Sequence, residues 1–139
     1  MSSTYNDIRA AIEGRLATEM AVAPAYPVSY QNVAFTPPNT TPWLQVFIRF
    51  GDNGYATLLS PSTGTNRQNG VLTVNVYTPK GVGTGANLTI AERVKDLFDR
   101  VKLDGIIFDA ASGPAEVIPG SPEPYFQTQL TVTFEAYLV

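Results

Sequence analysis

The sequence contains no cysteine and no histidine among its 139 residues. Without cysteine the chain can form no disulfide, offers no thiolate nucleophile and cannot build a zinc–thiolate centre. Without histidine it lacks the commonest general base at neutral pH and the commonest side-chain ligand for transition metals. Any catalytic activity would therefore depend on carboxylates, lysines or hydroxyl groups.

Charged residues are scarce as well, because they make up 15% of the chain, against about a quarter in typical globular domains. The formal net charge is −3 at pH 7, which argues against a protein that grips nucleic-acid phosphates with clustered lysines and arginines. A surface covered by uncharged polar residues loses little solvation when a partner covers it. An assembling subunit and a monomer with an uncharged, loop-rich surface both fit this composition.

The sequence has no apolar run of membrane-spanning length. Its first residues also lack the basic and then apolar order of a secretion signal. The length suits one domain, residues 1–139. We therefore expect a single-domain protein of the cytoplasm that makes no contact with a membrane.

The longest regular pattern in the chain lies at its end, in residues 125–139. Apolar and polar residues alternate there, which predicts a β-strand with one buried and one wetter face. Thr128 is the one polar residue on the apolar side of this pattern. Because the usual strand has about five or six residues, we expect this one either to bend at Thr128 or to leave the core and meet another chain.

Two stretches show the apolar spacing of helices, residues 4–21 and about 87–101. Alternating patterns predict further strands, which lie at residues 28–30, 43–50, 70–78, 103–108 and 115–118. Residues 111–114 are predicted to form a turn. Since the connections between strands are too short for crossover helices, we predict an α+β domain, a mostly antiparallel sheet with two helices packed on one face.

Two segments of this predicted sheet point to contacts beyond the main core. The second face of strand 43–50 carries Trp43 and Phe47, so either a second layer of the same chain or another subunit is expected to cover it. Residues 51–69 show little apolar periodicity apart from 55–59, and residues 60–69 are predicted to form a long polar loop. Because such loops in compact domains are usually functional or mobile, we interpret this segment as an interaction arm.

The sequence Gly81-Val82-Gly83-Thr84-Gly85 follows a predicted strand and precedes a predicted helix. Backbone N–H groups in this position could hold an anion, as in phosphate-binding loops. The glycine spacing is not that of a dinucleotide-binding loop, however, and no Gly-Lys-Ser/Thr ends the segment as in a Walker loop. A tight connection is therefore favoured over a small-ligand site.

The densest group of carboxylates is Asp96, Asp99, Asp104 and Asp109, which are interspersed with arginines and lysines. Such a mixture is typical of a solvated helix face, where opposite charges three or four residues apart are neighbours. No Ser-x-x-Lys sequence supplies a lysine base for a serine nucleophile. We predict no catalytic residues, no metal site and no cofactor, and hence no enzyme.

Several segments together make the chain resemble the tail terminator proteins of tailed bacteriophages. The most specific is Asn32-Val33-Ala34-Phe35-Thr36-Pro37-Pro38 before a strand. Residues 42–46, 70–77, 91–94 and the closing strand add to the resemblance. It implies a structural subunit that forms a ring, a hexamer, which caps the tail tube and joins it to head-completion and neck proteins. DNA would pass through the ring only as cargo, and the protein would be part of the virion after assembly in the host cytoplasm.

The alternative left open by the residues is a non-viral adaptor or a small-ligand-binding module that uses the glycine loop. If the chain forms a ring, we expect contacts from the polar arm and from the outward side of the strands. The candidates are Tyr55, Arg67, Asn69, Tyr77, Gln127, Gln129 and Tyr137. An interface of this kind is polar and aromatic with few ion pairs, so its response to salt should be weak.

Overall fold

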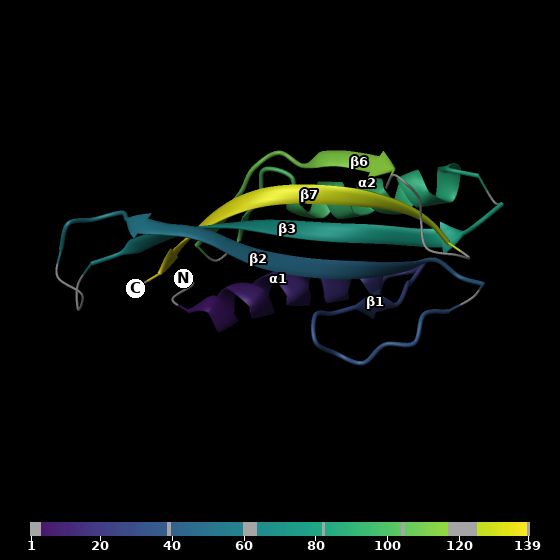
Figure 1. Ribbon diagram of the computed structural model, residues 1–139, viewed down its shortest axis with the longest axis horizontal. Coiled ribbons are helices and arrows are strands. Elements are labelled where there is room, and N and C mark those ends of the chain that lie inside the picture. The colour runs from purple at the N-terminus through teal and green to yellow at the C-terminus, as the bar shows by residue number, and fades with distance from the viewer. Residues whose placement is uncertain are drawn as a thin grey trace.

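Three long antiparallel strands form the centre of the computed structural model, which describes residues 4–38, 40–59, 64–81, 83–103, 105–116 and 125–138. They are β2 (Trp43–Tyr55), β3 (Asn66–Pro79) and β7 (Tyr125–Leu138), with β3 in the middle. Figure 1 shows these strands running along the length of the molecule.

The length of the closing strand is matched by β3, because both strands have 14 residues. They pair without a register shift from Asn66 opposite Leu138 to Pro79 opposite Tyr125. The pairing is therefore uninterrupted at Thr128, where a bend was one of the two alternatives expected. Thr128 interrupts the apolar pattern for another reason: its hydroxyl donates a hydrogen bond to Oδ1 of Asn87, and both side chains are buried beneath a helix.

Four short strands complete the sheet on its two sides. The two-residue strand β1 (Val28–Ser29) lies parallel to β2, while β5 (Ile106–Phe108) pairs with β7 and then with β4 (Lys102–Leu103). The predicted single strand at 103–108 is therefore wrong, since its residues belong to two strands, β4 and β5.

The strand β6 (Ser112–Glu116) pairs with the middle of β7. The turn predicted at 111–114 is thus mostly strand, because Ser112 pairs with Thr131 and Ala115 with Gln129, and a register shift between them accommodates the glycine and proline. Residues 117 and 118 of the predicted strand lie outside the described residues.

The two predicted helices are present as α1 (Tyr5–Met20) and α2 (Gly85–Phe98). The hydroxyl of Thr4 caps α1 by accepting a hydrogen bond from the N–H of Asp7 at 3.0 Å. Both helices contribute their apolar stripes to one core with the inward side chains of β2, β3 and β7. This arrangement confirms the α+β domain with two helices on one face of a mostly antiparallel sheet.

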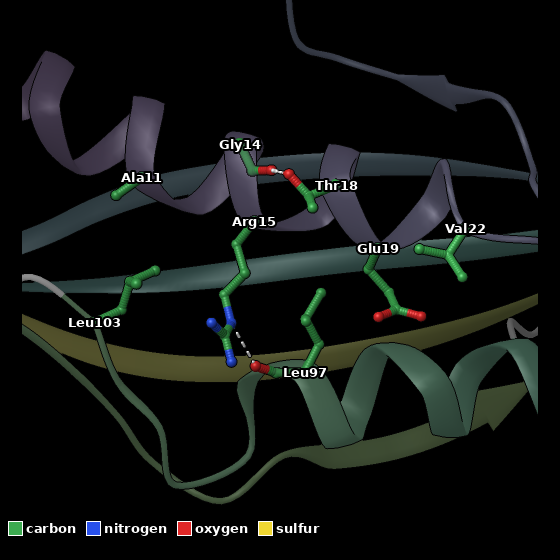
Figure 2. A pocket seen from close by; sticks show the side chains of 8 residues that line it. All are labelled: Ala11, Gly14, Arg15, Thr18, Glu19, Val22, Leu97 and Leu103. Atoms are coloured by element: carbon green, nitrogen blue, oxygen red, sulfur yellow. Dashed lines mark hydrogen bonds between the residues drawn. The ribbon is translucent and has the colours of Figure 1, made fainter.

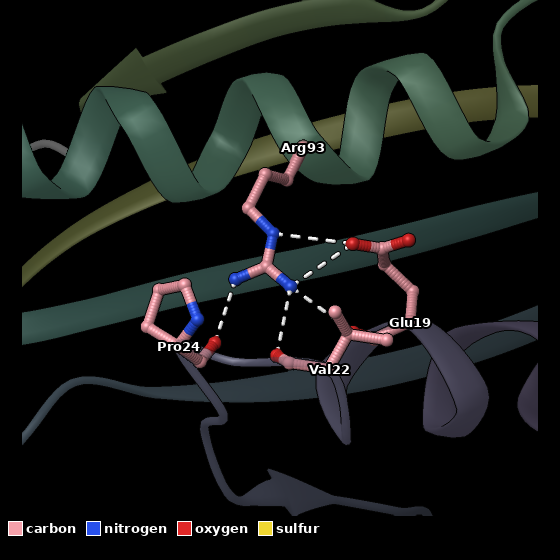
Figure 3. A network of polar contacts seen from close by, with 4 residues as sticks. All are labelled: Glu19, Val22, Pro24 and Arg93. Atoms are coloured by element: carbon pink, nitrogen blue, oxygen red, sulfur yellow. Dashed lines mark hydrogen bonds and ion pairs between the residues drawn. The ribbon is translucent and has the colours of Figure 1, made fainter.

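Arg93 of α2 links the two helices through a cluster of polar contacts (Figure 3). Its guanidinium lies 2.9 Å from a carboxylate oxygen of Glu19 and donates to the carbonyls of Glu19 and Pro24 at 3.0 and 2.8 Å. The last turn of α1 has no basic residue of its own, so Arg93 supplies the positive charge that favours a helix C-terminus. The spacing of the two helices is fixed at this point.

Candidate interaction surfaces

The predicted polar loop at 60–69 is partly strand, because β3 already begins at Asn66, and β2 continues beyond residue 50 to Tyr55. Figure 1 shows this hairpin projecting beyond the N-terminal end of α1. Strands made of polar residues show no alternation of apolar and polar positions, because backbone hydrogen bonds hold these strands together and neither face is buried. We call residues 53–59 and 64–67 the arm. The prediction that residues 66–69 belong to a loop is wrong, and residues 60–63 lie outside the described residues.

A β-bulge and one buried glutamine form the root of the arm. The register between β2 and β3 shifts between Phe50 and Asn53. The side chain of Gln68 lies at this bulge and is buried, with an exposed fraction of 1%. Its Oε1 accepts hydrogen bonds from the Tyr5 hydroxyl and the Asn53 amide, while its Nε2 donates to the carbonyl of Gly51 at 2.8 Å. The direction of the arm therefore depends on this amide, because a bulge bends its strand.

Aromatic rings pack across the strands next to this bulge. Phe50, Gly70 and Phe134 are direct neighbours on β2, β3 and β7. The missing side chain of Gly70 leaves room for the ring of Phe134, whose Cζ would lie 2.3 Å from a Cβ at that position. Phe134 in turn lies 6.3 Å from Phe50 and 5.8 Å from Phe108, measured between ring centres. The helix-covered core thus extends to the root of the arm and no further.

Large apolar side chains near the end of the arm are exposed. The exposed fraction is 80% for Tyr55, 94% for Leu58 and 64% for Leu59. The strands are held together there by hydrogen bonds from the N–H groups of Ala56 and Thr57 to the Thr65 carbonyl. The sequence from 53 to 66 contains no charged residue. The end of the arm is therefore an uncharged surface with several apolar side chains.

The sheet has an outer face, turned away from the helices, that is largely polar. A row of amides crosses it, because Asn75 of β3 donates to Gln45 of β2 and accepts from Gln129 of β7. Nearer the arm, Arg67 and Glu135 approach to 4.0 Å with side chains that are 53% and 34% exposed. An ion pair this open to solvent contributes little stability.

At the far end of the outer face, aromatic residues of the same chain cover the strands. Trp43 and Tyr77 stack with ring centres 4.1 Å apart, and Tyr125 and Phe35 pack against Trp43. The face of strand 43–50 with Trp43 and Phe47 was expected to be covered either by a second layer of the same chain or by another subunit. At the Trp43 end, residues of the same chain cover it. Burial raises the pKa of the Tyr77 hydroxyl, which donates a hydrogen bond to Gln45 at 3.0 Å.

The structure divides the seven candidate contact residues into three groups. Tyr77 and Gln127 are buried, with exposed fractions of 6% and 8%, so they present little surface to a partner. The outer face also carries four candidates that are exposed or half-buried, namely Arg67, Asn69, Gln129 and Tyr137. Tyr55 lies on the arm and on the same side of the sheet as Gln68. It is exposed, because the arm projects beyond the helix α1 that covers this side of the sheet.

Sequence reasoning missed a groove between the helices, an open cavity of about 430 Å³. Figure 2 shows its lining, which consists of Ala11, Gly14, Arg15, Thr18, Glu19 and Val22 of α1 and its end, with Leu97 and Leu103 opposite. The one signal in the sequence is Gly14, because a glycine inside a helix costs about 0.5–1 kcal/mol relative to alanine. A Cβ added to Gly14 would meet no atom within 4 Å, so packing inside the chain does not require glycine there.

The segments considered for chemistry have structural roles. Gly81 and Gly83 adopt positive φ angles of 90° and 83°, as expected for the tight connection favoured above. Asp99 accepts a hydrogen bond from the N–H of Ala111, and Asp109 accepts one from the Thr133 hydroxyl. Asp104 lies outside the described residues.

Within the described part of the chain, no group of three or more acidic side chains is arranged to hold a metal ion. In the same residues, no helix has the length and apolar character needed to cross a membrane. The remaining features are a single α+β domain, an open polar sheet face and a projecting arm. They define a small protein whose described surfaces are suited to contacts with other proteins.

A family described as phage tail terminator protein matches residues 7–110. The chain therefore belongs to this family of structural tail proteins, as the resemblance in its sequence predicted. A solved structure that is 26% identical in sequence matches 97% of this chain and 96% of its own with a TM-score of 0.70. No curated protein matches the sequence.

Proposed function

We propose that the protein forms a homo-oligomeric ring, a hexamer, that caps the finished tail tube and joins it to the head-completion and neck proteins. Membership of the tail terminator family supports a structural role in the tail. The observation that carries the ring is the arm, because it holds exposed apolar side chains outside the body of a chain that has its own complete core. DNA would pass through the ring as cargo, in keeping with the scarcity of positive charge.

We assign the subunit contacts to the arm and to the part of the outer face near it. The candidates with accessible surface are Tyr55, Arg67, Asn69, Gln129 and Tyr137. Tyr77 and Gln127 support the outer face from within the chain. Since few charges lie on these surfaces, apolar burial and hydrogen bonds would hold the ring together.

The test is sedimentation of the purified protein with and without assembled tail tubes, at about 0.05 M and 0.5 M salt. We expect the 15.0 kDa chain to be monomeric or weakly associated alone, and to form a ring on the tube end, because binding to one preformed surface favours the state that fits it. The ring should persist at the higher salt concentration.

Two results would contradict this proposal in different ways. A chain that stays monomeric on tube ends, or does not bind them, does not act as a ring-forming terminator. A ring that dissociates once salt exceeds about 0.15 M is held by charged pairs. In that case Arg49, Arg67, Glu116 and Glu135 replace the aromatic and amide residues as contact candidates.

A further inference from the structure

We propose that the arm of one subunit inserts Leu58 and Leu59 into the groove between α1 and α2 of the next subunit. This contact rests on the ring proposed above, and it specifies which two surfaces of the chain meet. The partner is a second copy of this chain.

The two leucines lie where the chain itself offers them no cover. Leu58 is 94% exposed and Leu59 is 64% exposed, although leucine is among the residues most often found in protein interiors. They follow Tyr55, which is 80% exposed, so three large apolar side chains lie within five residues. Apolar side chains gathered in this way are typical of a surface that binds another protein.

The groove has the composition that an uncharged apolar tip requires. Its two charged residues are already engaged, because Arg15 donates to the Leu97 carbonyl at 2.8 Å and Glu19 pairs with Arg93 at 2.9 Å. Figure 2 shows the Arg15 side chain crossing from α1 toward Leu97. The described residues at the end of the arm, 53–59 and 64–66, carry no charge, so they can enter without leaving a charged group of the groove unpaired.

Gly14 is an independent sign that something approaches this helix closely. Glycine weakens a helix interior, and the space next to it is empty within the chain. Because glycine has no side chain, it leaves room on the helix surface for an external group to approach the backbone closely. The groove lined by Gly14 is the place where an inserted side chain would meet the backbone of α1.

The contact has to be between molecules, because the two surfaces lie apart in one subunit. The arm projects beyond the N-terminal end of α1 (Figure 1), whereas the groove lies along the middle and C-terminal part of that helix, at residues 11–22. Two different surfaces that recognise each other make a head-to-tail contact. Repetition of such a contact closes a ring when the rotation between subunits allows it.

The absence of cysteine allows a direct test with single-cysteine proteins. Leu59→Cys protein and Thr18→Cys protein, one of them tagged, are mixed in equal amounts under mild oxidation where sedimentation shows assembly. We expect a disulfide-linked pair of the two different chains. The control mixture contains Leu59→Cys with Leu88→Cys, whose position is exposed on α2 and outside the groove lining, and should yield at least about tenfold less of the mixed pair.

A second measurement uses variants that change each surface and preserve the fold. Replacing the tip leucines by Leu58→Ser and Leu59→Ser, or filling the groove by Gly14→Met, should weaken self-association at least about tenfold, since burial of one leucine alone is worth that much. Leu88→Ser is the matched loss of an exposed leucine, and Gly14→Ala is the smaller change at the groove, which should weaken association less than Gly14→Met does. Leu88→Ser should keep association within about threefold of the unaltered protein. The leucine variants should unfold at or near its Tm, and the Gly14 variants at or above it, because glycine weakens a helix interior.

The outcomes separate this contact from the proposed function. If rings form but the tip and groove variants associate normally and no mixed disulfide appears, the contact is wrong and the ring stands. If the tip variant self-associates normally but no longer binds tail tubes, the arm contacts the tube protein and the contact is again wrong. If the unaltered chain forms no ring with or without tubes, the proposed function fails and the contact fails with it.

Discussion

Substitution of Gly70 by alanine should destabilise the protein, because the ring of Phe134 occupies the space of the missing side chain. A Cβ on residue 70 would lie 2.3 Å from Cζ of Phe134 and 2.8 Å from each Cε, whereas ordinary contact begins at 3.4 Å. The ring would have to move by about 1 Å, the difference between ordinary contact and the shortest of these distances. Phe134 is 2% exposed and also packs against Phe50 and Phe108, so the shift would pass to its neighbours.

Overpacking of this kind costs about 1–3 kcal/mol in measured cores. Because the closest contact is with the end of a ring and not with backbone, we expect the middle of that range, a loss of about 2 kcal/mol. For a chain of this size the Tm should fall by about 6–10 °C. Urea unfolding gives the change in free energy, and a thermal scan gives the change in Tm.

The control is a double-mutant cycle with Phe134→Leu, which removes the end of the ring. Phe134→Leu alone should cost stability, but in that background Gly70→Ala should cost less than about 0.5 kcal/mol, which leaves a coupling of more than 1 kcal/mol. Gly54→Ala serves as a second control, since a Cβ there meets nothing within 4 Å. Strictly additive effects of Gly70→Ala and Phe134→Leu would refute this explanation of the glycine.

Three further predictions concern polar groups that hold the fold together. Arg93→Ala should lower the free energy of unfolding by about 1–2 kcal/mol, and Arg93→Lys should recover less than half of the loss, because the ion pair is partly exposed and most bonds need the guanidinium fork. Equal stability of the lysine variant and the unaltered protein in urea would contradict this. Asn87→Ala should cost about 2–4 kcal/mol, since it leaves buried groups of β3 and β7 unpaired, whereas Thr89→Ala on the exposed side of α2 should change stability by less than about 0.5 kcal/mol. Similar urea midpoints for these two variants would argue against the buried network. Burial raises the pKa of Tyr77, so unfolded Tyr77 ionises at a lower pH than folded Tyr77. Stability should therefore fall as the pH rises from about 10 toward the folded pKa. Tyr77→Phe should flatten that part of the curve of urea midpoint against pH, and an unchanged slope would rule out this contribution.

Assembly on the tail tube is the outcome on which the functional proposal depends. The arm would be the part of the chain that changes most, because its exposed apolar side chains become covered only when the neighbouring subunit is present. The groove should keep its shape on assembly, because its walls are two helices packed on a complete core.

Local patterns were enough to predict the elements with one buried and one open side. The helical spacing of Tyr5, Ile8, Ile12 and Leu16 predicted a buried stripe, and the last three have exposed fractions of 0%, whereas Tyr5 at the start of the helix is 48% exposed. The closing strand and the fold class also follow from periodicity, because burial of one face imposes a repeat that is visible within a single segment. The family follows from sequence segments alone, without any tertiary contact.

Only the tertiary structure decided which segments cover one another. It extended β2 beyond residue 50 and β3 into the predicted loop, because Gln68 and backbone pairing hold that hairpin and neither leaves an apolar repeat. It buried Tyr77 in a second aromatic cluster on the outward side of its strand, and it paired the polar Thr128 with Asn87 on the buried side of β7. The groove at Gly14 exists only because two helices far apart in the sequence meet there. These features depend on contacts between distant residues, and a periodic pattern within one segment carries no information about its partner.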